Sequence, residues 1–348
     1  MLRTNAAAER KIKLIMQNYY GYGYTPANYP DYSPDPIERR QIKAVYSKCG
    51  WLLLINIGIM NVIAVVWSLV NMSMRLGSGT SDYYNAYDLA MGYFSPVIAN
   101  IITIVICMNW GGSRIKDFFG TEKLTGRFIL VSVAVFLGIQ VIIVMVQNML
   151  MSALDSVGLG VPSLDYETEK SVAAAVIGII SSSITAPIFE ELLFRGYLLS
   201  FMSKVSTRFA IVISALFFGL FHGNIYQFIL AFAGGLWLGY ITVKSRSIIP
   251  AMISHCAANT VIECVSLISD YNEDLANGIF NIYVPVILLI AAAALIYYMK
   301  SLRKKMPPVK ERTEYHRKRD FPIYLTSIPV WIYTILTVIQ IFAGIKEV

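Results

Sequence analysis

The chain has 348 residues, of which 56% are hydrophobic and 15% are charged. It is too apolar for a soluble protein and too long for a single anchor, so we expect an all-α, multi-pass membrane protein, a polytopic bundle of about eight to nine transmembrane helices. The net charge of +7 is explained by basic loops beside an anionic lipid leaflet, and it requires no nucleic-acid partner.

The first 48 residues are basic, rich in Tyr and Pro, and lack an early apolar core. They predict a cytoplasmic tail without a cleavable signal peptide, so that the first membrane helix serves as the insertion signal. Apolar runs long enough to cross a bilayer begin near Gly50, Leu89, Phe128, Ser171, Ile248, Ile279 and Pro322. Between the fourth and fifth runs, residues 208–243 are predicted to form two more segments, folded back at His222-Gly223-Asn224.

These runs divide the chain into a tail (1–48), two N-terminal transmembrane helices (49–124), a core (125–270), a transmembrane helix (271–300), a basic cytoplasmic linker (301–320) and a C-terminal transmembrane helix (321–348). Basic loops alternate with acidic ones, of which 152–170 and 268–278 are the clearest. By the positive-inside rule the N-terminus is cytoplasmic and the C-terminus external. We expect the plasma membrane as the location, with membrane lipid as the surrounding partner.

Charged and titratable residues interrupt the apolar core. The run from Pro187 to Gly196 contains Glu190, Glu191 and Arg195, and two of the three histidines, His222 and His255, also lie in apolar segments. Because a charge near the bilayer centre costs several kcal/mol, an ionisable residue inside a membrane helix indicates a functional site.

These polar groups are predicted to lie at one depth. If the helix continues past Arg195 to Met202, Glu190 lies about 12 residues, or roughly 18 Å, from the cytoplasmic end. Counted in the same way, His222 lies roughly 21 Å deep, Asn259 is about 12 residues in, and His255 is one turn shallower. Three helices would thus bring their polar groups to one intramembrane cavity that opens to the cytoplasmic side.

Spacing within each helix gives further expectations. His255 and Asn259 are four residues apart and share a face, and Glu191 can form an ion pair with Arg195 at the same spacing. Pro187 removes a backbone hydrogen bond just before Glu190, which exposes a carbonyl that needs a polar partner or water, and a water-filled cavity would supply it. Glu263 continues the face of His255 and Asn259, but we interpret it as a helix-end carboxylate.

A carboxylate, two imidazoles and a carboxamide support two chemistries. In one, Glu190 and His222 activate a water while His255 and Asn259 donate hydrogen bonds to an oxyanion. In the other, Glu190, His222 and His255 bind a divalent metal, with zinc as the expected ion, which activates its own water. Both chemistries are hydrolytic, and the sequence leaves the choice open. The non-catalytic alternative is a polar network that joins helices, which four groups at one depth disfavour.

Three motifs resemble those of the CPBP intramembrane proteases, which include the type II CAAX prenyl endopeptidases and the bacterial Abi (abortive-infection) proteins. EExxxR matches Glu190, Glu191 and Arg195; FxxxH matches Phe218 and His222; HxxxN matches His255 and Asn259. The resemblance covers about residues 125–270. It implies a membrane endopeptidase with Glu190, His222, His255 and Asn259 as the catalytic set, described in the family either as a metalloprotease or as a glutamate-dependent protease.

The resemblance leaves the substrate open. It implies a membrane-associated peptide or protein, with prenylated CAAX-type proteins as one class and bacteriocin immunity or peptide maturation as the bacterial contexts. A non-enzymatic immunity factor or scaffold that binds a peptide in the same cavity is the alternative function. A proton- or ion-coupled transporter is disfavoured, since we find no inverted repeat between the two halves.

Overall fold

The structure is a computed structural model that describes residues 36–78, 82–111, 114–121, 124–160, 176–306, 309 and 322–347. The predictions for the Tyr-rich part of the tail, for most of the acidic loop 152–170 and for most of the linker 301–320 lie outside these residues. The chain divides after Arg39 into two units, Met1–Arg39 and Arg40–Val348.

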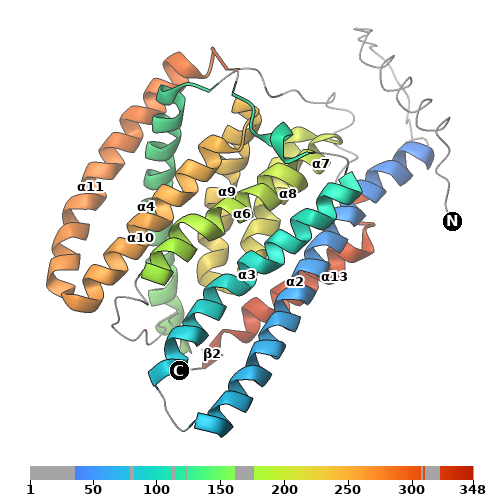
Figure 1. Ribbon diagram of the computed structural model, residues 1–348. Coiled ribbons are helices and arrows are strands. Elements are labelled where there is room, and N and C mark those ends of the chain that lie inside the picture. Colours follow the sequence, from blue (N-terminus) through green and yellow to red (C-terminus); the bar gives the residue numbers. More distant parts are fainter. Residues whose placement is uncertain are drawn as a thin grey trace. The chain divides into compact units, whose positions relative to one another are not determined.

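The regular secondary structure of the described residues is helical apart from two strands of two residues each (Figure 1). In chain order the elements are α2 (Pro36–Ser78), α3 (Asp82–Gly111), the 3-10 turn η1 (Ile115–Phe118), α4 (Gly126–Asp155), β1 (Leu159–Gly160), η2 (Ile179–Thr185), α6 (Ala186–Glu191), η3 (Leu192–Leu198), α7 (Leu199–Ser203), α8 (Thr207–Phe221), α9 (Ile225–Ser245), α10 (Ile249–Tyr271), α11 (Glu273–Tyr297), η4 (Tyr298–Leu302), α13 (Ile328–Ala343) and β2 (Lys346–Glu347). The segments η2, η3 and η4 are π-helical.

The expectation of an all-α, multi-pass membrane bundle is confirmed. Within the described residues, 6 helices are long and apolar enough to cross a membrane: Arg39–Ser73, Gly126–Asp155, Val176–Ser203, Ile225–Ser245, Ile249–Tyr271 and Glu273–Leu302. Three shorter apolar helices, Phe94–Trp110, Thr207–Phe221 and Ile328–Ala343, complete the set. Their apolar outer faces, which include many exposed Leu, Ile and Val side chains, suit contact with lipid.

Several helices extend beyond their apolar runs. Helix α2 begins at Pro36, so the end of the predicted tail, 36–48, is helical, and α3 and α11 begin at Asp82 and Glu273, before the predicted starts. Hydropathy locates the part of a helix that faces lipid, whereas good helix formers and caps decide where the helix begins. For α11 the cap is Asn272, whose side chain accepts a hydrogen bond from the Leu275 amide.

The predicted fold-back between residues 208 and 243 is present. Helix α8 ends at Phe221, and α9 begins three residues after His222, at Ile225. Gly223 has a φ of +67°, and a side chain there would also collide with Gln340 of α13. The next residue, Asn224, caps α9 by accepting a hydrogen bond from the Gln227 amide at 2.7 Å.

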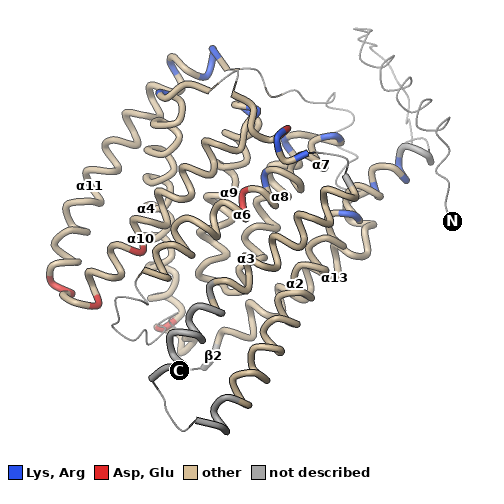
Figure 2. Tube along the Cα trace, in the orientation of Figure 1, with Lys and Arg blue, Asp and Glu red and all other residues tan. Residues whose placement is uncertain are grey.

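Most charged residues lie near the ends of the helices, whereas α6 carries acidic residues inside the bundle (Figure 2). Lys and Arg follow the end of α11, whereas Asp and Glu lie at the opposite end, around the turn between α10 and α11. The strands β1 and β2 pair antiparallel and join the chain after α4 to the chain after α13. Which end faces the cytoplasm stays a prediction from the loop charges.

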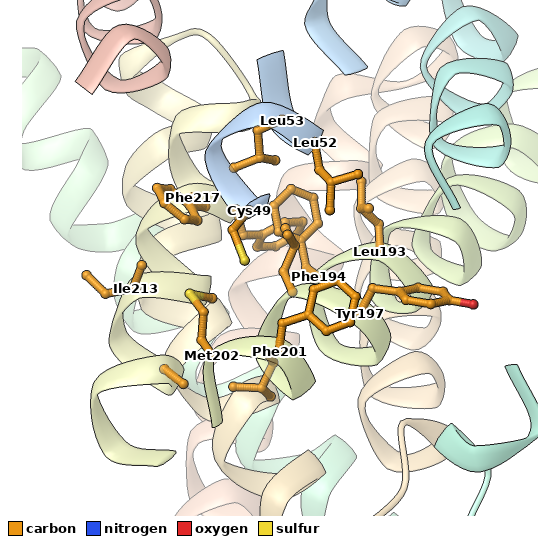
Figure 3. Packing of buried hydrophobic residues seen from close by; sticks show 14 of the residues in the cluster. Cys49, Leu52, Leu53, Leu193, Phe194, Tyr197, Phe201, Met202, Ile213 and Phe217 are labelled. Carbon is orange, nitrogen blue, oxygen red and sulfur yellow. The ribbon is translucent and has the colours of Figure 1, made fainter. Parts of the chain in front are cut away.

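The apolar interior has two centres. The larger one joins α2, α3, η3, α7, α8 and α13, and Figure 3 shows Phe194, Tyr197 and Phe217 packed beside Cys49 and Leu52. The second one joins α4, α9, α10 and η4 around Phe128, Leu238 and Tyr298. The helix that spans Val176–Ser203 packs against α3 and against α8, α9 and α10, and its segments η3 and α7 belong to the larger centre.

Candidate active site

The carboxylates lie on an interrupted helix. The span Val176–Ser203 runs as the π segment η2, the short α-helix α6, the π segment η3 and the final turn α7. Glu190 and Glu191 end α6, between the two π segments. The expected continuation of the helix past Arg195 is confirmed. π-Helical turns are rare and are often found at functional sites.

Pro187 leaves one carbonyl of this helix without a backbone donor. In a π segment each N–H bonds the carbonyl five residues earlier, as Ala186 does with Ser181. Pro187 has no N–H, so the carbonyl that its place in this pattern leaves open is that of Ser182. The Asn259 side chain of α10 donates to it at 2.8 Å. The sequence predicted that such a carbonyl would need a partner, but it is an amide from a neighbouring helix that serves it.

Glu191 and Arg195 form the expected ion pair. Arg195 donates from Nη1 to Glu191 Oε1 at 2.8 Å, and both side chains are fully buried. The guanidinium also lies over the ring of Phe218, 4.2 Å from its centroid. A buried pair costs desolvation and is retained where its geometry is good, since losing one partner would leave an isolated charge.

His255 connects both carboxylates of the motif. Its Nδ1 lies 3.0 Å from Glu191 Oε1, and its Nε2 lies 3.8 Å from Glu190 Oε2. A carboxylate paired with arginine only accepts hydrogen bonds, so Nδ1 carries the hydrogen and Nε2 is left facing Glu190. Sequence reasoning gave Glu191 a supporting role through Arg195 but missed its contact with His255, because spacing along one helix does not reveal contacts between helices.

His222 is oriented in a similar way at the end of α8. Its Nδ1 lies 2.8 Å from the Phe218 carbonyl, which can only accept, so Nδ1–H is the donor and Nε2 holds the lone pair. The ring of Phe218 meets the imidazoles of His222 and His255 edge to face, with centroids 5.0 Å and 5.6 Å away. Phe218 therefore fixes the positions of both histidines beneath Arg195.

The predicted residues are thus brought to one region, by different routes. Glu190, Glu191 and His255 are in direct contact, and His222 joins them through Phe218, whereas Asn259 lies one turn along α10 and bonds Ser182. Glu263 of α10 has a partner on the π segment η2: its carboxylate accepts a hydrogen bond from the Ser182 hydroxyl. It is therefore more than the helix-end carboxylate that the sequence indicated.

The metal hypothesis meets a geometric difficulty. Throughout the described part of the chain, no three His, Cys, Asp or Glu side chains are placed to hold a metal ion. The candidate ligands Glu190, His222 and His255 therefore do not form a ligand set as placed. His222 and His255 have another feature in common. Each has its Nδ1 hydrogen-bonded and its Nε2 available, which suits Nε2 to accept a proton or a hydrogen bond from water.

Comparison with known proteins finds similarity to a described family in this region. Residues 172–261 match the family model described as type II CAAX prenyl endopeptidase Rce1-like. Over 112 residues the chain is 30% identical to a protein of Bacillus subtilis (strain 168) named "Putative membrane peptidase YdiL", an alignment that covers 32% of this chain and 46% of that protein. The chain thus spans about half the length of the curated relative it matches. No solved structure gives a significant match.

The matched segment contains the whole predicted catalytic set, from Glu190 to Asn259, and ends two residues before Glu263. The resemblance that the three motifs indicated is therefore confirmed at the level of the family. Helices α2, α3, α4, α11 and α13 lie outside the match.

Proposed function

We propose that this chain, whose residues 172–261 match the family model described as type II CAAX prenyl endopeptidase Rce1-like, is an intramembrane endopeptidase that uses Glu190, His222, His255 and Asn259. The observation that carries the proposal is the contact between Glu190 and Nε2 of His255. The other ring nitrogen of His255, Nδ1, is held by Glu191. A carboxylate beside an imidazole that a second carboxylate orients is an arrangement suited to moving a proton.

The first step is the activation of water. Glu190 takes a proton from a water molecule that the Nε2 lone pair of His222 positions as a hydrogen-bond acceptor. The resulting hydroxide attacks the carbonyl carbon of the peptide bond, which forms a tetrahedral intermediate with a negatively charged oxygen. Since both nitrogens of His222 are committed in this role, its Nδ1–H bond to Phe218 fixes where the water lies.

The proton then passes towards the leaving group. From Glu190 it crosses to His255 Nε2 and forms an imidazolium, which Glu191 stabilises through Nδ1, as the aspartate of a serine-protease triad does. The imidazolium donates to the oxyanion and then protonates the departing amine as the C–N bond breaks. Asn259 uses one N–H for Ser182, and its second N–H is left for the oxyanion.

None of these reaction steps uses a metal ion, because no three His, Cys, Asp or Glu side chains of the described residues are placed to hold one. The substrate class follows from the location: a peptide bond within or beside the bilayer, in a membrane-associated protein or peptide. Prenylated CAAX-type proteins are the class that the family description names. With the basic loops inside, the N-terminus is cytoplasmic and the site opens to the cytoplasmic side.

The test is cleavage by purified protein in lipid nanodiscs. Two peptides of identical sequence, one prenylated on cysteine and one free, would be incubated with wild type and with Glu190→Gln, which keeps the shape but loses the base. We expect wild type to cleave and the variant to be slower by about 10²- to 10⁴-fold. Glu273→Gln, an exposed glutamate at the start of α11, is the matched control and should cleave like wild type.

The peptide pair and the metal content extend the result. Faster cleavage of the prenylated peptide would assign the CAAX-type substrate class, whereas equal rates would assign a general membrane peptidase. Metal measured by plasma mass spectrometry on the same active preparation decides between the two chemistries. Full activity in Glu190→Gln would refute the proposed site, and a biological effect that survives without cleavage would support the immunity or scaffold function.

A further inference from the structure

Ser182 connects two helices through hydrogen bonds. Its carbonyl accepts from the Asn259 amide, while its hydroxyl is shared between the Gly178 carbonyl, at 2.7 Å, and the carboxylate of Glu263. Asn259 and Glu263 are four residues apart on α10, one turn and two turns after His255. Two successive turns of α10 therefore hold the same residue of the π segment η2.

We propose that Ser182 and Glu263 are positioning residues that, with Asn259, fix η2 in its π form and so set the rotation at which Glu190 faces His255. The inference rests on the proposed function for its activity readout. Its structural basis is independent: Pro187 leaves the Ser182 carbonyl open, and α10 supplies the polar groups that compensate.

The link from Ser182 to Glu190 is geometric. A π turn contains one residue more than an α turn, so a change of η2 to regular α-helix would rotate everything after it by about 100°. Such a rotation would move Glu190 away from Nε2 of His255, which now lies 3.8 Å from it. The polar contacts made by Ser182 oppose this change. In a regular α-helix the carbonyl that Pro187 leaves open would be that of Ser183, so Asn259 would no longer face the carbonyl that lacks a donor.

Glu263 also has a simpler interpretation, as a carboxylate near the end of a membrane helix that faces headgroups. A headgroup-facing carboxylate has no need of a partner on a neighbouring helix, whereas Glu263 is half-buried and contacts Ser182. The two interpretations differ in the effect expected of Glu263→Ala. The first predicts no change in catalysis, and ours predicts a lower kcat.

The first experiment is a kinetic cycle with Ser182→Ala and Glu263→Ala. We expect each variant to lower kcat by about tenfold or more with KM within about twofold, since sub-ångström misplacement of a base affects the chemical step. The double variant should be no slower than the slower single one, because both remove the same contact. Glu263→Gln keeps an acceptor oxygen and should restore kcat, and Asp270→Asn, an exposed carboxylate on α10, is the control.

Additive losses, a change confined to KM, or no loss in either variant would overturn the proposal. The result is separable from the proposed function: if Glu190→Gln cleaves normally, the function fails, and the structural claim is then tested by stability alone.

The stability experiment uses Pro187→Ala, which gives residue 187 an N–H for the Ser182 carbonyl. Asn259→Ala should lower Tm in the wild-type background and lower it much less in the Pro187→Ala background, since the carbonyl then has a backbone donor. Equal Tm losses in both backgrounds would show that Asn259 does not compensate for Pro187, and would overturn the inference.

Discussion

Two membrane helices of nearly equal length show what the site requires. Helix α4, Gly126–Asp155, is continuous over 30 residues and carries no charged side chain between Arg127 and Asp155. The span Val176–Ser203, with 28 residues, alternates between π and α segments and carries Glu190, Glu191 and Arg195. We call them the regular helix and the interrupted helix.

The two helices satisfy their polar groups differently. The regular helix satisfies part of its polar groups by itself: Thr125 caps its first turn, and the Ser132 hydroxyl bonds the Phe128 carbonyl of the same helix. Two further hydrogen bonds join it to α9, from Gln147 to the Tyr226 carbonyl and from Trp237 to the Ser132 carbonyl. No side chain caps the joints of the interrupted helix, and its polar groups depend on α10, through His255 and Asn259. Irregular backbone and buried charge occur together because both need a neighbouring helix to compensate for them.

The largest expected effect breaks the charge balance of the interrupted helix. Arg195→Met leaves Glu191 as a buried, uncompensated charge, which should lower the free energy of unfolding by about 3 to 5 kcal/mol. Arg127→Met, at the exposed start of the regular helix, should leave it unchanged. Chemical denaturation in detergent micelles, followed by near-UV circular dichroism, measures both variants.

The double variant Glu191→Gln/Arg195→Met sharpens this prediction. It removes both charges, so it should recover part of the stability lost in Arg195→Met, because a neutral pair avoids the desolvation cost. Catalysis should not recover, since Glu191 also orients His255 through Nδ1. A double variant less stable than Arg195→Met would contradict this account of the ion pair.

The sequence predicted the regular helix and the fold-back at Gly223 well, because apolar runs and turn residues are local signals. It also predicted the Glu191–Arg195 pair, which depends only on spacing along one helix. It did not predict that the polar groups of α10 would hold Ser182, or that Glu191 would contact His255. Those contacts depend on how two helices are rotated relative to each other. The π segments that set this rotation have no amino-acid composition that distinguishes them from an α-helix.

The prediction of intermediate size concerns two glycines at close contacts between helices. A Cβ on Gly138 of the regular helix would lie 2.3 Å from the Ala291 Cβ of α11. One on Gly235 of α9 would lie 3.1 Å from the Ala215 Cβ of α8 and 3.2 Å from Nη2 of Arg195. Valine at either position should cost about 1 to 3 kcal/mol of unfolding free energy through overpacking. Only Gly235→Val should also lower kcat, because it displaces Arg195 and through it Phe218 and Glu191.

Equal loss of kcat in Gly138→Val and Gly235→Val, measured with the peptide assay at matched Tm, would contradict the distinction between the two helices. It would mean that overpacking between α4 and α11 displaces the catalytic groups as much as overpacking around Arg195 does. The separation of the two apolar centres argues against this, since Phe194 and Phe218 belong to one and Phe128 and Leu238 to the other.

The smallest expected effect concerns the cap of the regular helix. Thr125 accepts a hydrogen bond from the Phe128 amide at 3.2 Å, and Thr125→Ala should cost about 1 kcal/mol of unfolding free energy. Thr125→Ser keeps the hydroxyl and should restore the stability. Because the cap acts only within its own helix, kcat should be the same in all three proteins, and a fall in kcat with Thr125→Ala would show that the regular helix also positions the catalytic groups.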